Sequence, residues 1–206
     1  MNLKTVNIPF MDENAYLISG QKGAVIIDPG QFNDEIKAFI EENSKKEFAV
    51  LLTHNHFDHI MGAAEIKKLT NARIIISEAD AQGLCDGMIN LADRFCVSFE
   101  PFSADAVFND NDCLFVGDIE IKALVTPGHT QGSSCFIIGD WMFSGDTLFR
   151  LSIGRTDFTG GDRDEQIISL KRLSNIKGEY EVYPGHGPAT RLSYEKQYNP
   201  YIKEIL

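Results

Sequence analysis

The sequence lacks any apolar run long enough to cross a membrane. A spanning helix needs about 20 consecutive apolar residues, and no stretch of the 206 residues approaches that length, although 43% of them are hydrophobic. The N-terminus, Met1-Asn2-Leu3-Lys4, leads directly into strand-like sequence without a secretory signal. We therefore expect a cytoplasmic protein with no membrane partner and a substantial core. Its length predicts a single domain over residues 1–206.

Basic residues are also scarce. The chain has 19 Lys and Arg against 30 Asp and Glu, which gives a formal net charge of -11. Proteins that bind phosphate backbones need clustered Lys and Arg, so we expect no nucleic-acid partner. The acidic excess favours solubility. A small-molecule substrate remains open, because a cationic pocket can lie within an acidic surface, and the oligomeric state is open too.

Cysteine is limited to four scattered positions, Cys85, Cys96, Cys113 and Cys135. No two of them form a C-x-x-C pair, and none is near the histidines at positions 54–59. This pattern predicts reduced, mostly buried thiols rather than a disulfide framework. A catalytic cysteine is the weaker alternative.

Histidine is also rare, but three of the five histidines are concentrated in His54-Asn55-His56-Phe57-Asp58-His59. The cluster follows the apolar run 48–52, which predicts a buried strand, and precedes a predicted helix at 60–69. On extended chain His54 and His56 point the same way, while Asp58 and His59 lie on the turn. Imidazole and carboxylate ligands suit zinc, iron or manganese. The alternative makes Asp58 a helix N-cap among surface histidines, and the density of ligands disfavours it.

Three further residues have the same setting. His129 and His186 each stand in a Pro-Gly-His tripeptide after an apolar strand, and Asp146 follows the apolar strand that ends at Phe143. Alone, each is an ordinary loop residue. Together with the first cluster they make seven ligands, too many for one tetrahedral zinc. We predict two metal sites and a bridging Asp146, with the remaining ligands divided as His54, His56 and His129 on metal 1, and Asp58, His59 and His186 on metal 2.

The remaining pattern alternates short strands with helices. It predicts strands at 3–8, 15–18, 24–27, 72–77, 113–116, 119–125, 134–138, 141–143 and 180–183, and helices at 33–43, 164–173 and 193–206. This order is typical of an α+β fold with two stacked sheets and helices outside. Segment 78–104, with a short helix at 79–85 and a loop at 94–101, is either a cover over the site or a surface excursion.

The motif H-x-H-x-D-H, followed by a distant His, Asp and His, resembles the metallo-β-lactamase-fold hydrolases. The resemblance implies a four-layer αββα sandwich with two metal ions at one edge. A water shared between such ions loses a proton near neutral pH and becomes a strong nucleophile. Class B β-lactamases carry a cysteine in place of Asp146, and flavodiiron proteins carry an acid in place of His56 and an added flavin domain. Nucleases of the fold carry an inserted domain and basic surfaces, which are not visible here.

The chain resembles most closely the small glyoxalase II-like hydrolases of bacteria. It shares with them the segments Phe149-Arg150, Gly154-Arg155-Thr156-Asp157, Gly185-His186-Gly187-Pro188, Glu195 and Asn199-Pro200. Glyoxalase II enzymes hydrolyse S-lactoylglutathione and use a C-terminal helical domain, for which this chain is too short. They also place an aromatic pair near the positions of Thr156 and Asp157, and this chain has neither aromatic. Arg155 matches a basic residue that contacts glutathione, so it binds a substrate carboxylate or else pairs structurally with Asp157.

The resemblance implies a metal-dependent hydrolase of a thioester, such as S-lactoylglutathione or a related acyl-thiol. A metal-bridging hydroxide is the nucleophile, and Asp58 is the catalytic residue as well as a ligand. The cofactor would be two divalent ions, zinc first, with iron or manganese also accepted. The alternative is a persulfide dioxygenase with one Fe(II) on His54, His129 and Asp146, and a non-catalytic scaffold is a third. Two roles explain Phe10, Met11 and Phe149 equally well: walls of a substrate pocket or residues of the core.

Overall fold

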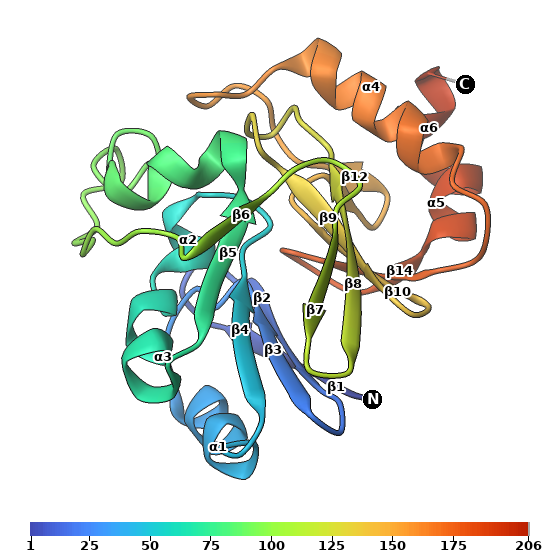
Figure 1. The fold of residues 1–206 in the computed structure, drawn as a ribbon. Coiled ribbons are helices and arrows are strands. Elements are labelled where there is room, and N and C mark those ends of the chain that lie inside the picture. Colours follow the sequence, from blue (N-terminus) through green and yellow to red (C-terminus); the bar gives the residue numbers. More distant parts are fainter. Residues whose placement is uncertain (206) are drawn as a thin grey trace.

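The computed structural model describes residues 1–205 and has two six-stranded sheets packed face to face (Figure 1). The first sheet contains, in spatial order, β1 (Asn2–Ile8), β2 (Glu13–Ser19), β3 (Gly23–Ile27), β4 (Glu47–Leu51), β5 (Arg73–Ser77) and β6 (Ala106–Phe108). The second contains β14 (Thr190–Arg191), β13 (Glu181–Pro184), β10 (Trp141–Gly145), β9 (Ser134–Ile138), β8 (Ile119–Val125) and β7 (Cys113–Val116). A two-stranded ribbon joins β11 (Leu148–Phe149) to β12 (Ser152–Ile153).

Helices cover the outer faces of both sheets and complete four layers (Figure 1). The first outer face is covered by α1 (Asp34–Glu42) and α3 (Ala63–Thr70), preceded by the short α2 (Phe57–Ile60) and followed by the 3-10 helix η1 (Glu78–Cys85). The second is covered by α4 (Arg163–Ser174), α5 (Leu192–Tyr198) and α6 (Pro200–Ile205). The predicted αββα architecture is confirmed. None of the helices in residues 1–205 combines the length and the apolar character that crossing a membrane requires.

Strand β4 shows how the layers arise from sequence. Its side chains alternate between faces, as they must on extended chain. Phe48 and Val50 pack with the helices on the outer face, whereas Ala49 and Leu51 pack between the two sheets. Because both faces are covered, the strand reads as a continuous apolar run instead of an alternating one.

Strand direction brings the site together at one edge. Strands β3 and β4 run parallel in the first sheet, and β10 and β13 run parallel in the second. Strand β8 shares the direction of β10, because each of them is antiparallel to β9. The carboxyl ends of all five strands therefore meet at the same edge of the sandwich. The loops that follow them carry Asp28, His54, His129, Asp146 and His186.

Several predictions from sequence were wrong in detail. The helix expected at 60–69 begins earlier and is broken, so that Asp58 and His59 lie inside the turn of α2. The expected closing helix 193–206 is two helices, since the side-chain oxygen of Asn199 caps α6 at Tyr201 and Pro200 starts it; position 206 lies outside the described residues. Three of the four cysteines are exposed, and Cys135 alone is buried. Strands β6, β11, β12 and β14 were not expected, because two or three residues carry no readable period.

Candidate metal centre

Two clusters of histidine and aspartate lie at the shared edge. His54, His56 and His129 present ligand atoms that all lie within 4.8 Å of one another. The same is true of Asp58, His59 and His186. These are the two groups that the sequence predicted as separate metal sites, and the fold brings each of them together from distant segments.

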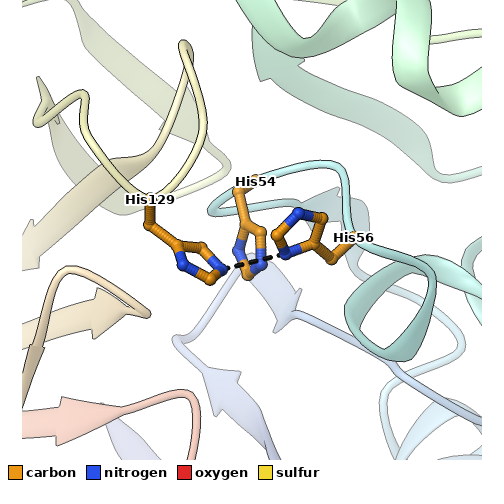
Figure 2. Close-up of side chains that lie close together, drawn as sticks. All are labelled: His54, His56 and His129. Carbon is orange, nitrogen blue, oxygen red and sulfur yellow. Dashed lines mark hydrogen bonds between the residues drawn. The ribbon is translucent and has the colours of Figure 1, made fainter. Parts of the chain in front are cut away.

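The first cluster joins the loop after β4 to the loop after β8. Figure 2 shows the three rings converging, with His129 facing His56 across a dashed contact. His129 Nε2 lies 2.9 Å from His56 Nδ1. Because His129 Nδ1 donates to a carbonyl oxygen, His56 Nδ1–H donates to His129 Nε2 in this contact, and a cation between the two nitrogens would take the place of the shared proton. His54 is fully buried beside them, 4.7 Å and 4.9 Å from the His56 and His129 ring centres.

The second cluster joins α2 to the loop after β13. His59 Nε2 lies 3.3 Å from His186 Nε2, and the Asp58 carboxylate lies 3.5 Å from the same His186 nitrogen. The backbone must approach closely here. A Cβ atom on Gly185 would lie 2.3 Å from the Asp146 carboxylate and 2.7 Å from the His59 ring, so no larger residue fits at this position.

Asp146 lies between the clusters. Its Oδ2 is 3.4 Å from His129 Nε2 and 3.6 Å from His186 Nε2, and its Oδ1 is 3.6 Å from His59 Nε2. One carboxylate thus faces ligands of both groups. This is the position that a bridging ligand requires.

The far nitrogen of four rings is held by an acceptor of the chain. Nδ1 of His129 donates to the Arg155 carbonyl oxygen (2.7 Å), and Nδ1 of His186 donates to the Asp12 carbonyl oxygen (3.1 Å). Nδ1 of His59 donates to the Asp28 carboxylate (3.1 Å). Thr53 Oγ1 gives its proton to Asp28 (2.6 Å) and therefore accepts from His54 Nδ1 (3.0 Å). In the neutral form of each ring Nε2 keeps its lone pair, which is the usual arrangement of a histidine that binds a metal.

Charge and burial also suit a cation. Burial, followed by the neighbouring histidines, lowers the pKa of His54 and His56 well below the usual value, so both rings are neutral ligands near pH 7. Burial opposes charge on Asp58, but His59 and His186 keep the pKa of this carboxyl below its usual range. Burial likewise opposes charge on His59, yet Asp146 and Asp58 hold its pKa above normal. A bound cation would replace the proton that His59 retains.

The residues present fit a pair of metal ions. His54 Nε2 and Asp146 Oδ1 are buried and have no hydrogen-bond partner within residues 1–205. Such orphaned atoms are rare in proteins because leaving them unpaired is costly. Both belong to predicted ligands, and a cation at each cluster would pair them. The donor set of imidazole and carboxylate is the one that zinc, iron and manganese accept.

Two buried acids near the second cluster were missed in the sequence. Asp28 follows β3, and its carboxylate also accepts the Thr53 backbone N–H (2.7 Å). Its setting at the end of an apolar strand, next to the strand that leads to His54, was an available signal. Glu13 is fully buried 3.9 Å from His59 Nδ1, and burial raises its pKa well above the usual value. Nothing in its local sequence distinguishes it from a surface residue.

Above the clusters lies a cavity of about 410 Å³. Met11 and Phe149 line it as wall residues, whereas Phe10 lies outside it against Phe57. Segment 78–104 forms part of the cover, because Leu91 and Phe95 also line the cavity. Of the two interpretations of this segment, a cover over the site or a surface excursion, the structure therefore favours the cover.

Arg155 lies at the cavity and pairs with Asp157 through two contacts of 2.6 Å. Both side chains are more than half exposed, so this pair contributes little to stability. The guanidinium also stacks 3.8 Å from the ring centre of Phe158, which lines the cavity. Phe158, the residue after Asp157, thus supplies an aromatic ring beside Arg155.

Known proteins resemble this chain over nearly its whole length. The chain is 31% identical to the probable metallo-hydrolase YqgX of Bacillus subtilis, with 92% of each chain covered. It is 32% identical to the hydroxyacylglutathione hydrolase GloC of Haemophilus influenzae, with 98% of each covered.

Solved structures agree in fold. BLEG-1, described as a B3 metallo-beta-lactamase, has a TM-score of 0.90 at 29% identity and covers 98% of this chain and 99% of its own. TTHA1623, solved in a di-iron-bound form, has a TM-score of 0.85 at 32% identity, with 96% and 99% covered. ETHE1 from Myxococcus xanthus has a TM-score of 0.80 at 29% identity, with 97% and 84% covered.

The family model described as the metallo-beta-lactamase superfamily matches residues 8–186, a range that ends on the last predicted ligand. That range contains all seven residues of the two clusters and the bridging position. By this match, and by the fold that places those residues together, the chain belongs to the metallo-beta-lactamase superfamily.

Proposed function

We propose that this protein is a metal-dependent hydrolase of acyl thioesters, with two divalent ions, preferably zinc, as its cofactor. One observation carries the proposal: Asp146 lies between two clusters of ligands on the floor of a single cavity. The similarity to GloC, a hydroxyacylglutathione hydrolase, favours a thioester of glutathione, the class to which S-lactoylglutathione belongs.

The division of labour follows from the geometry. His54, His56 and His129 would hold one ion and Asp58, His59 and His186 the other, with Asp146 shared. Bound ions would supply an activated water and polarise the carbonyl oxygen. Asp28 and the Arg155 carbonyl keep their histidine rings oriented.

The remaining groups bind and shield the substrate. Asp58 is both a predicted ligand and part of the cavity lining, so it lies where a substrate carbonyl would stand. The apolar walls keep bulk water away from the reacting atoms. Thiolates are good leaving groups, so no general acid is required, and none is assigned. At the cavity mouth Arg155 is placed to meet a carboxylate of the thiol carrier.

The first test is thiol release from a panel of thioesters by protein of measured metal content. We expect hydrolysis that a chelator abolishes and that added zinc, iron or manganese restores. A β-lactam belongs in the panel as a control, since BLEG-1 shares the fold at 29% identity. Loaded protein that cleaves the β-lactam but no thioester would contradict the proposal.

A persulfide dioxygenase is the second candidate. It would use one Fe(II) on two histidines and one carboxylate, and His54, His129 and Asp146 form such a set. His129 Nε2 and Asp146 Oδ2 are 3.4 Å apart, and the di-iron-bound form of TTHA1623 supports iron as an acceptable metal for this fold. Oxygen consumption by iron-loaded protein with glutathione persulfide, in the absence of thiol release from any thioester, would favour this function instead.

A further inference from the structure

The cavity above the metal centre is divided sharply by chemistry. Its floor is made of predicted ligands: His56, Asp58, His129, Asp146 and His186. Its walls are apolar: Met11, Phe57, Leu91, Phe95, Phe149, Ile153 and Phe158. Arg155 is the remaining lining residue. Among the described residues, therefore, no serine, threonine, tyrosine, asparagine or glutamine side chain lines the cavity.

The aromatic part of the wall is built from three distant segments. Phe57 belongs to α2, Phe95 to the cover segment and Phe158 to the loop before α4. The ring centres of Phe57 and Phe95 are 5.5 Å apart, and those of Phe95 and Phe158 are 6.0 Å apart. These are ordinary separations of packed aromatic pairs. The wall is therefore a continuous surface and does not consist of isolated exposed side chains.

Two arginines hold Phe158 in this wall. The Arg94 guanidinium lies 4.8 Å from the Phe158 ring centre, and that of Arg155 lies 3.8 Å from it. Arg94 belongs to the cover segment and Arg155 to the loop before α4, so the stack ties these segments together at the cavity. Phe95 nonetheless remains 44% exposed, so part of its ring is free to contact a ligand.

We infer that the acyl group of the substrate is apolar, and that this site discriminates against hydroxyacyl groups such as lactoyl. The inference rests on the proposed thioesterase function. With the carbonyl carbon at the metal floor, the rest of the acyl group must lie against the apolar wall. A hydroxyl group that faces this wall loses its hydrogen bonds to water and finds no side-chain partner on the wall.

A matched pair of substrates tests the inference. S-isobutyrylglutathione and S-lactoylglutathione share the carrier and differ only by a methyl in place of the hydroxyl. Each kcat/KM is divided by the rate of hydroxide-catalysed hydrolysis of the same thioester, which removes the intrinsic activation by the hydroxyl. We expect the corrected value for the isobutyryl thioester to be higher by about tenfold.

Binding gives a second readout that does not depend on turnover. S-isobutylglutathione and S-(2-hydroxypropyl)glutathione are thioethers and cannot be hydrolysed. Calorimetric titration of the metal-loaded protein should give a Kd about tenfold lower for the isobutyl compound. Equal affinities would mean that the wall does not contact this part of the ligand, and would overturn the inference.

Variants connect the preference to the wall. Phe95→Ala should lower kcat/KM for S-phenylacetylglutathione about tenfold, but that for S-acetylglutathione by less than about threefold. Phe115→Ala is the matched control, because Phe115 is exposed on β7 and does not line the cavity. An equal loss with both substrates in Phe95→Ala would contradict a role in acyl selection.

The experiments distinguish a wrong function from a wrong acyl preference. If loaded protein hydrolyses no thioester, the proposed function fails and the acyl preference fails with it. If it hydrolyses the lactoyl thioester faster than the isobutyryl thioester after correction, the function stands and the inference is overturned.

Discussion

At the scale of single residues, the groups that hold the histidine rings in place are as informative as the predicted ligands themselves. Asp28 is a buried carboxylate that accepts from the Thr53 N–H, the Thr53 hydroxyl and His59 Nδ1. Through Thr53 it also sets the orientation of His54. One residue thus controls the ring orientation of one ligand from each cluster, without facing the cavity itself.

Asp28→Asn should weaken metal binding while the protein stays folded. An asparagine retains the size of the side chain but loses the charge that stabilises His59. Changes in residues that hydrogen-bond to a metal-binding histidine lower metal affinity about 10- to 100-fold. Competition with a chelator of known affinity measures the change. An unaltered affinity, with normal unfolding, would show that Asp28 serves only the backbone turn.

Asp146→Asn probes the bridge between the clusters. The amide cannot offer two anionic oxygens, so we expect loss of at least one bound ion per chain and a fall in thiol release of at least about 100-fold. Elemental analysis of the purified variant gives the metal content. Asp140→Asn is the control, since the Asp140 side chain makes no hydrogen bond within residues 1–205. Near-normal turnover in a fully loaded Asp146 variant would remove the bridging role.

At the scale of elements, the short helix α2 explains how four ligands fit into six residues. The extended chain of His54 to His56 ends where α2 begins, and the helical turn then directs Asp58 and His59 to the second cluster. Gly62 ends this arrangement. A Cβ atom there would lie 2.6 Å from the Pro29 carbonyl oxygen, which accepts the Gly62 N–H at 2.7 Å. The close approach fixes α2 against the loop that carries Asp28.

The contact between the loops β2–β3 and β7–β8 makes a prediction about pH. The Asp118 carboxylate accepts the backbone N–H groups of Gln21, Lys22 and Gly23, and these bonds lower its pKa to about 2. A carboxyl whose pKa is lower in the folded state stabilises the fold above its unfolded pKa, near 3.8. That contribution is lost as the pH falls toward 2.

Asp118→Ala should therefore lower the Tm at pH 7, and the difference from the wild type should narrow below pH 4. Thermal unfolding followed by circular dichroism between pH 7 and pH 3 tests this expectation. Asp140→Ala, in the turn between β9 and β10, should show no such pH-dependent difference. A constant difference across the range would mean that the Asp118 charge is not involved.

At the scale of the whole molecule, the metal centre joins the two halves of the sandwich. His54, His56, Asp58 and His59 come from the first half of the chain, and the other three predicted ligands come from the second. In the absence of cations, buried carboxylates and histidines at this junction carry unpaired atoms. Metal binding should therefore stabilise the folded state as a whole.

Removal of metal should lower the Tm by about 5–10 °C, if the metal had been present at about 100 times its Kd. Scanning calorimetry of loaded and chelator-treated protein measures this shift. Magnesium is the matched control ion, since it prefers oxygen ligands and should restore little of the loss. A Tm that does not respond to zinc, iron or manganese would contradict metal binding at the junction.

The architecture and a set of candidate ligands could be predicted from the sequence, because both depend on local patterns. The spacing in His54-x-His56-x-Asp58-His59 is a property of one segment, and apolar runs between turns indicate strands wherever they lie. The members of each predicted cluster lie close together in the structure, and a third group joins Asp28 to His54 and His59.

Tertiary structure alone decided what surrounds the ligands. The pairing of Asp28 with His59, the burial of Glu13 and the stack of Arg94 on Phe158 join segments far apart in the chain. No local pattern encodes such contacts, because they depend on which strand ends meet at one edge. The break between α2 and α3 and the cover formed by Leu91 and Phe95 also depend on tertiary contacts. Packing thus surrounds the predicted ligands with apolar side chains and forms the cavity above them.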